Sequence, residues 1–182
     1  MTIWVTSDCH FGHRNILAYC PESRPFSDTA IHDAVLIENW NSVVKPEDTI
    51  YVLGDFFMGP LTLIDEILPQ LNGNIKLVSG NHDEKRRLRK FQEYGVELLA
   101  YKEGYQLFHD GVLFYMNHFP IEKTDYNGCA QVYLYGHIHD AAPEGLIAEV
   151  PCDTFHVGVD TNNLTPVNLS DIAELYKEEH NV

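Results

Sequence analysis

The chain opens with IWVTSDCH (Ile3–His10), a short apolar run of β-type residues that passes directly into Asp8, Cys9 and His10. Five similar runs follow it, and each has the length and the β-branched or aromatic content of a buried strand. We expect strands at Ile3–Thr6, Thr49–Leu53, Ile75–Val78, Val112–Met116, Val132–Tyr135 and Phe155–Val159.

Helical periodicity separates the first strands. Apolar residues recur at helical spacing behind a candidate N-cap at Asp28 and again behind Pro60, which predicts two βα units. From about Val96 the strands follow one another with little helix between them, which is typical of a β-meander. Ser170 is then expected to cap a last amphipathic helix, Asp171–Glu179. The chain is predicted to be one domain over residues 1–182, α/β in its first half and β-rich in its second.

Composition narrows the function. Among 182 residues, 12 are Lys or Arg and 27 are Asp or Glu, which gives a net charge of −15. Such a surface repels phosphate backbones and argues against a protein that wraps nucleic acid. No apolar run approaches the roughly 18 residues that a bilayer span needs, and no cationic leader precedes the first strand. We therefore expect a cytoplasmic protein with no membrane partner. The four cysteines form no C-x-x-C pair and are expected to be reduced and mostly inert.

Polar residues of one kind follow the predicted strands. Aspartate, asparagine or histidine comes directly after five of them, at Asp8 and His10, Asp55, Asn81, His118, and His137 and His139. Because the carboxyl ends of strands line up at one edge of an open α/β sheet, these side chains are expected to converge. Gly54, Gly80 and Gly136 precede three of the groups and indicate sharp turns or close backbone approaches.

These seven residues share a donor chemistry. They offer two aspartates, one asparagine and four histidines, with no thiolate. Nitrogen and oxygen donors suit Mn²⁺, Fe, Co²⁺ or Zn²⁺ and do not suit a structural cysteine-type zinc site. Any one of them alone would more often be a turn former or a surface residue. As a set they suffice for two metals about 3.5–4 Å apart, an arrangement that activates a hydroxide and clamps the oxygens of a phosphoester.

The order of the motifs resembles one family. Asp-x-His, Gly-Asp, Gly-Asn-His-Asp, a separate His and Gly-His-x-His occur in the order of the calcineurin-like metallophosphoesterase superfamily. The segments SDCHFGHRNIL, NWNSVVKPEDTIYVLGDF and VGVD resemble its small, single-domain bacterial and phage members. The resemblance implies an α/β fold, a four-layer α/β/β/α sandwich of two mixed β-sheets flanked by helices.

The resemblance also implies roles for individual residues. Asp8, His10 and His139 would hold one metal. Asn81, His118 and His137 would hold the other, and Asp55 would bridge the two. His82 would be the catalytic histidine, with Asn81 and Asp55 acting beside it in the catalytic centre. The implied cofactors are two divalent metal ions, with Mn²⁺ preferred and Fe, Zn, Co or Ni as alternatives.

Residues outside the motifs receive weaker expectations. Arg14, with its fork of donors, and His13 are candidate substrate-binding residues, although a solvated loop pair fits them equally well. Asp83 is expected to cap the helix that follows it, and Cys9 to pack as a small hydrophobe. Asp160 receives no role. His32, His109, His156 and His180 have no motif around them and are expected to serve surface or core packing.

Two further segments bear on the substrate. Lys85–Lys90 holds five of the twelve basic residues. It is expected to be a solvated helix face, with guidance of an anionic substrate as the functional alternative. The loop Pro120–Gln131 is expected to shape the substrate pocket.

The leading hypothesis is a dinuclear metal-dependent phosphoesterase. Phosphodiesters are favoured, because compact members that resemble this chain often act on them. The expected substrate is a small phosphoester or nucleotide, with a nucleic-acid end less favoured, and the sequence specifies no oligomeric state. The alternative is a catalytically inactive scaffold that binds proteins, which would be expected to have lost Asp55 or His82. A metallo-β-lactamase-type site would need His-x-His-x-Asp-His, whereas His139 is followed by Asp140 and Ala141.

Overall fold

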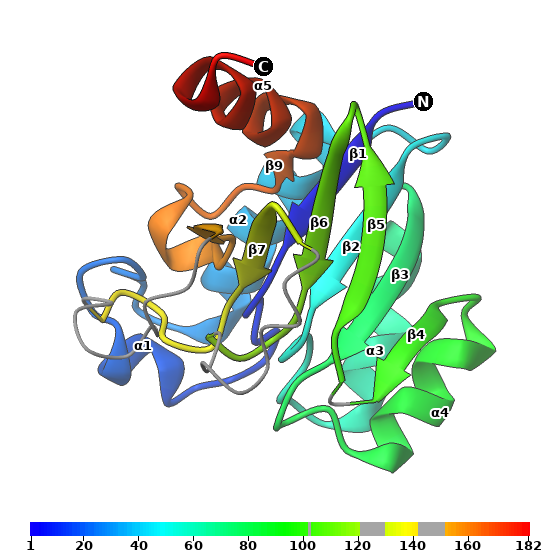
Figure 1. The fold of residues 1–182 in the computed structure, drawn as a ribbon. Coiled ribbons are helices and arrows are strands. Elements are labelled where there is room, and N and C mark those ends of the chain that lie inside the picture. The colour runs from blue at the N-terminus through cyan, green and yellow to red at the C-terminus, as the bar shows by residue number, and fades with distance from the viewer. Residues whose placement is uncertain (102, 121–129, 142–151) are drawn as a thin grey trace.

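Two β-sheets stack face to face in the computed structural model, which describes residues 1–101, 103–120, 130–141 and 152–182 (Figure 1). In chain order the elements are β1 (Ile3–Thr6), α1 (Ile16–Tyr19), α2 (Thr29–Val43), β2 (Thr49–Leu53), α3 (Leu61–Ile67), β3 (Asn74–Ser79), α4 (Lys85–Glu93), β4 (Glu97–Tyr101), β5 (Tyr105–His109), β6 (Val112–Met116), β7 (Val132–Tyr135), β8 (Asp153–His156), β9 (Val167–Asn168) and α5 (Leu169–His180). Short 3₁₀ turns at Leu68–Gln70 and Val159–Thr161 complete the described chain.

The first sheet has the strand order β4-β3-β2-β1-β9. Its first four strands in sequence are parallel, and β9 runs antiparallel to β1, with Val167 opposite Val5. All five residues of β2 are buried, because helices cover one face of this sheet and the second sheet covers the other. Trp40 of α2, Ile64 of α3 and Phe91 of α4 pack in the helix-side core. The βα units predicted for the first half are confirmed.

The helix boundaries follow local capping. The Asp28 carboxylate accepts a hydrogen bond from the amide of Ile31 at 2.9 Å and caps α2, as predicted. Helix α3 begins directly after Pro60. The last helix begins earlier than expected, because Asn168 rather than Ser170 is its N-cap. The Asn168 side chain accepts from the Ser170 amide at 3.0 Å.

The second sheet has the order β5-β6-β7-β8, and here the prediction of a meander is wrong. Only β5 and β6 are antiparallel, whereas β6, β7 and β8 are parallel. A parallel pair needs a connection of about a dozen residues or more. Residues 117–131 and 136–152 supply connections of that length. The strand expected at Phe155–Val159 spans Asp153–His156 instead, because Val159 begins a 3₁₀ turn.

The fold class agrees with the prediction, since the chain forms two mixed sheets flanked by helices. Between the sheets lies a second apolar core, to which α5 contributes Leu169, Ile172 and Ala173. Cys9 is buried in the helix-side core, as expected. Within the described ranges, no helix is both long and apolar enough to span a membrane.

Candidate metal centre

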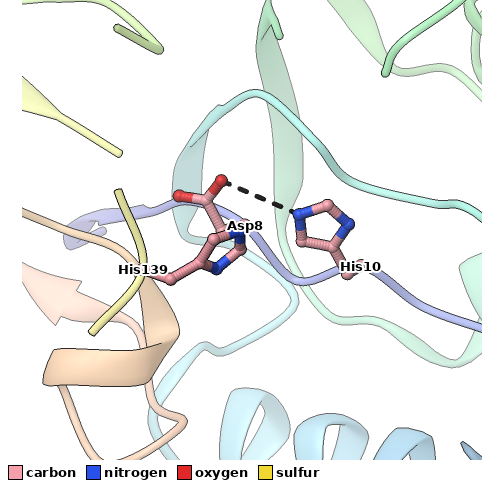
Figure 2. A group of neighbouring side chains, drawn as sticks. All are labelled: Asp8, His10 and His139. Atoms are coloured by element: carbon pink, nitrogen blue, oxygen red, sulfur yellow. Dashed lines mark ion pairs between the residues drawn. The ribbon is translucent and has the colours of Figure 1, made fainter. Parts of the chain in front are cut away.

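Two clusters of aspartate and histidine lie where the strands end. The ligand atoms of Asp8, His10 and His139 lie within 4.8 Å of one another, and so do those of Asp55, His118 and His137. Figure 2 shows the first cluster, in which Asp8 and His10 come from the segment after β1 and His139 comes from the segment after β7. The sequence predicts that these residues converge at the edge of one sheet, whereas in the structure they converge from the loops of two sheets.

Asp55 belongs to the second cluster and also faces the first. Its Oδ2 atom is 3.6 Å from Nε2 of His10, which belongs to the first cluster. The same oxygen is 3.4 Å from Nε2 of His118, which belongs to the second. One carboxylate therefore reaches both groups of side chains.

The backbone that carries these residues is strained. Left-handed φ angles, which cost non-glycine residues free energy, occur at five of the seven candidate ligands: Asp8 (59°), His10 (52°), Asp55 (52°), His137 (72°) and His139 (53°). Long-range backbone hydrogen bonds hold two of them, since the His10 amide donates to the Asp55 carbonyl at 2.9 Å and the Asp8 amide donates to the Gly54 carbonyl at 3.1 Å. Strain of this kind persists only where the surroundings enforce it, and it gathers at functional sites.

Glycines allow the loops to approach one another. A Cβ atom on Gly54 would lie 2.6 Å from the backbone of Gly80 and from Nδ1 of His118. A Cβ on Gly136 would overlap the side chains of Ser7 and Asp8. The close approaches predicted at these positions are confirmed, because a side chain there would clash with the facing loops.

The first cluster has unsatisfied buried donors and acceptors. Within the described part of the chain, Oδ1 of Asp8 and Nε2 of His10 are buried without a hydrogen-bond partner, and they face each other at 4.0 Å. Leaving such atoms unpaired is costly, whereas a cation between them would satisfy both. Burial lowers the pKa of His10 well below its usual value, which favours the neutral imidazole that binds metals. The residues present fit a divalent metal ion.

The second cluster is organised around His118. Its Nδ1 atom donates to the Leu53 carbonyl at 2.8 Å, so Nε2 faces Asn81 Oδ1 at 2.8 Å and His137 Nδ1 at 3.2 Å. Asn81, predicted as a ligand, therefore belongs to this cluster. A backbone acceptor on one ring nitrogen is the usual way in which a metal-binding histidine is oriented.

Charge is balanced in the second cluster by a proton on histidine. Burial by itself would lower the pKa of His118, but Asp55 and Asp8 raise it to about 9. Burial would likewise raise the pKa of Asp55, but the contact with His118 outweighs it and holds that carboxyl below its usual value. At neutral pH the site thus keeps a cationic imidazole beside a carboxylate, a charge that a metal ion would replace.

The predicted catalytic histidine lies on the open side of the clusters. The His82 side chain is 44% exposed, with Nε2 3.9 Å from Oδ2 of Asp55. His13 also joins the site, since its Nδ1 is 3.2 Å from Nδ1 of His10. Arg14 lines a surface cavity with Leu17, Ala18, Phe26, Ser27, Asp28 and Thr29, none of which is a candidate ligand, and its side chain has no hydrogen bond or ion pair with another described residue.

Asp83 corrects one expectation. It does not cap α4, whose N-cap is Glu84. Its buried carboxylate accepts hydrogen bonds from the amides of Asp55 at 2.8 Å, Phe56 at 3.2 Å and Gly80 at 2.9 Å. Asp83 therefore connects the loop after β2 to the loop after β3 and holds the backbone of Asp55 in place.

Sequence reasoning missed Arg24 and assigned no role to Asp160. Arg24 is fully buried and forms an ion pair with Asp160, whose other oxygen is 2.8 Å from Nδ1 of His139. The sequence gives no signal for this pair, because Arg24 lies in no recognisable motif and Asp160 is 136 positions away in the chain. The loop Pro120–Gln131, expected to shape the substrate pocket, lies outside the described residues at 121–129.

Comparison with known proteins identifies the family. The chain belongs to the calcineurin-like phosphoesterase superfamily, because residues 1–150 match the model of the superfamily's domain. An uncharacterized protein of Methanocaldococcus jannaschii is 36% identical over 130 residues, which cover 68% of this chain and 73% of that protein. The resemblance drawn from the motifs is confirmed, and the two clusters are candidate metal sites of a phosphoesterase domain.

Two further proteins resemble the chain, one in sequence and one in structure. Gene 66 protein of Mycobacterium phage L5 is 37% identical over 84 residues, which cover 44% of this chain but only 39% of the phage protein. The crystal structure of a protein of unknown function from Aquifex aeolicus superimposes with a TM-score of 0.76 at 25% identity, covering 96% of this chain and 98% of that one.

Proposed function

We propose that this protein is a dinuclear metal-dependent phosphoesterase. The observation that carries the proposal is the position of Asp55, one carboxylate oxygen within 3.6 Å of a histidine from each cluster. In this proposal Asp8, His10 and His139 would hold one ion, Asn81, His118 and His137 would hold the other, and Asp55 would be shared by the two. Two divalent cations would supply Lewis-acid stabilisation of the phosphoryl oxygens and lower the pKa of the attacking water.

The residues of the chain supply the remaining steps. His82 lies at the open side, where its Nε2 can donate a proton to the leaving oxygen. His13, beside His10, borders the same opening and would contact the substrate. The buried arrangement of the clusters positions the phosphoryl group and limits water around it.

We propose a phosphodiester as the preferred substrate. The preference rests on the resemblance to compact members of the superfamily, which often act on diesters. The substrate is proposed to be either a small diester or a nucleotide-type compound.

Two further proposals complete this one. Mn²⁺ is the proposed ion, because the donors are all nitrogen or oxygen. Residues 1–182 are proposed to act as a single metallophosphoesterase domain. Beyond the family match at residues 1–150, strand β9 pairs with β1, and α5 fills the core between the sheets.

The test is hydrolysis of bis(p-nitrophenyl) phosphate against p-nitrophenyl phosphate. Activity on the diester should exceed that on the monoester, disappear on chelation and return with Mn²⁺. Asp55→Ala should abolish it and lower the bound Mn²⁺ measured by elemental analysis. Asp110→Ala is the matched control, because Asp110 also has a left-handed backbone but is exposed in the turn between β5 and β6. Full activity in Asp55→Ala would contradict the proposal.

A further inference from the structure

Arg24 is a buried arginine whose guanidinium bonds residues beside the first cluster of the candidate metal centre. It is 0% exposed, in the loop between α1 and α2. Its Nε and Nη2 atoms donate to the two oxygens of Asp160, each at 2.7 Å. Nη2 also donates to the Asp8 carbonyl at 2.6 Å, and Nη1 donates to the Cys9 carbonyl at 3.1 Å. One guanidinium therefore binds a carboxylate and two backbone carbonyls together.

The two carbonyl bonds hold the segment that carries the first pair of candidate ligands. Asp8 and His10 both have left-handed backbones, which relax unless neighbouring groups hold them. Arg24 bonds the carbonyls of Asp8 and Cys9, the two consecutive residues that precede His10. The guanidinium thus holds the backbone of Asp8 and of Cys9, the residue before His10, and through this segment it orients the Asp8 and His10 side chains.

The carboxylate bond reaches the third candidate ligand. Oδ2 of Asp160 is 2.8 Å from Nδ1 of His139, so Nε2 of that ring remains to face Asp8 and His10. Ser23 Oγ donates to Asp160 Oδ1 at 2.9 Å. Both Asp160 oxygens therefore have several partners, and the carboxylate fixes the tautomer and the plane of the His139 ring.

The hydrogen-bond network of Arg24 extends to His32 and Asp33 of α2. Nη1 of Arg24 is 3.0 Å from Nε2 of His32, whose Nδ1 is 2.9 Å from Asp33. Asp33 in turn accepts a hydrogen bond from the Gly12 amide at 2.9 Å. These contacts surround the Asp8–Gly12 segment. His118 of the second cluster is oriented separately, by the Leu53 carbonyl.

We propose that Arg24 and Asp160 are positioning residues that set the metal affinity of the first cluster, Asp8, His10 and His139, and not that of the second. The inference rests on the proposed function, because it requires that metals bind at these clusters. Arg24 bonds the backbone of one ligand, Asp8, and of Cys9, which directly precedes the second ligand, His10. Asp160 contacts the third ligand, His139. Lysine cannot replace this arrangement, since it lacks the planar fork that bonds a carboxylate and carbonyls simultaneously.

The test is a calorimetric titration of the metal-free protein with Mn²⁺, for wild type, Arg24→Lys and Asp160→Asn. Loss of an outer hydrogen-bond partner lowers metal affinity about 10–100-fold. We expect that loss at one of two sites, with the other site unchanged. Electron paramagnetic resonance at one equivalent of Mn²⁺ should then show an isolated ion in the variants, and elemental analysis after dialysis should return close to one ion per chain.

Arg87→Lys is the matched control. Arg87 also donates to two loop carbonyls, those of Gly59 at 2.7 Å and Met58 at 3.2 Å, but it contacts neither Asp160 nor His139. It should retain both sites. Equal weakening of both sites in Arg24→Lys and Asp160→Asn, or no weakening, would overturn the proposal. A wild type that binds fewer than two Mn²⁺ ions would instead contradict the proposed function, before any variant is compared.

A measurement on the wild type avoids the risk that a buried substitution prevents folding. In Zn²⁺-loaded protein with ¹⁵N-labelled histidine, we expect the His139 signals of a ring protonated at Nδ1 and bound to metal at Nε2. The opposite assignment would show that Asp160 does not orient this ligand, and would overturn the proposal.

Discussion

The backbone amide of His82 donates a hydrogen bond to Oδ1 of Asp55 at 2.9 Å. The other oxygen of Asp55 faces the two clusters, so one side chain both contacts the candidate ligands and anchors the loop that carries the candidate catalytic histidine. The His82 end of this bond is backbone. Removing the His82 imidazole therefore leaves the anchor intact, whereas removing the Asp55 carboxylate disturbs ligands and loop together.

His82→Ala should keep both metals and lower kcat about 10²–10⁴-fold, the range for loss of a general acid. The effect should shrink on diesters with very acidic leaving groups, which need little protonation. Steady-state kinetics on a series of aryl diesters, with metal analysis of the same samples, checks this. His180→Ala, at the exposed end of α5, is the control. Loss of metal from His82→Ala would refute the division of roles.

Asp83→Ala should destabilise the fold. The substitution leaves the buried amides of Asp55, Phe56 and Gly80 without their acceptor, and each unsatisfied group costs about 1–3 kcal/mol. A loss of about 3 kcal/mol or more in the free energy of unfolding is expected from urea denaturation. Asp171→Ala, on the exposed first turn of α5, should change it little. Similar free energies of unfolding for both variants would show that Asp83 does not hold the two loops together.

Metal binding should release a proton below about pH 9. The metal-free protein holds a proton on His118, whose pKa is raised to about 9, and a metal must displace it. The deprotonation of His118 should make the Mn²⁺ affinity rise with pH up to about 9 and then level off. In the metal-free protein, protonated His118 stabilises the fold. This contribution to the free energy of unfolding is fully present below the usual histidine pKa near 6.5 and is lost as the pH rises through about 9. Calorimetry in buffers of different ionisation enthalpy measures the released proton. Affinity that falls between pH 7 and 9 would contradict this.

Substrate guidance by α4 can involve only part of its basic run. Arg87 bonds the carbonyls of Gly59 and Met58, and Lys90 pairs with Asp65 at 2.7 Å. Among the described residues of this run, Arg86 and Arg89 are exposed without such partners, as is Lys85. The double variant Arg86→Gln/Arg89→Gln should raise KM for a polyanionic substrate. It should also flatten the salt dependence, by about 0.7–0.9 in logarithmic slope per lost phosphate contact.

A small aryl diester is the control substrate for the double variant and should be turned over as before. If both substrates respond equally, or neither responds, these arginines are surface charge.

Local sequence was sufficient where the signal is local. The βα units, the Asp28 cap and the strand ends that carry Asp55 and His118 follow from short-range periodicity and from residue types at strand boundaries. The motif order also identified the family, since the residues of each motif are sequence neighbours. Convergence of Asp8, Asp55 and Asn81 was predictable, because their strands are parallel and bring their carboxyl ends to one edge of a sheet. The four-layer fold implied by the family resemblance accounts for the histidines that follow β6 and β7 in the second sheet.

Tertiary structure alone decided what depends on contacts between distant segments. The strands β6, β7 and β8 pair in parallel, which requires long connections between them. The residues of the strands themselves do not encode whether the pairing is parallel or antiparallel. Arg24 and Asp160 meet across most of the chain, and Asp83 reaches back to amides of the β2 loop. Sequence shows that such polar residues are present. Only the folded chain shows which buried donors and acceptors must be satisfied, and these side chains satisfy them.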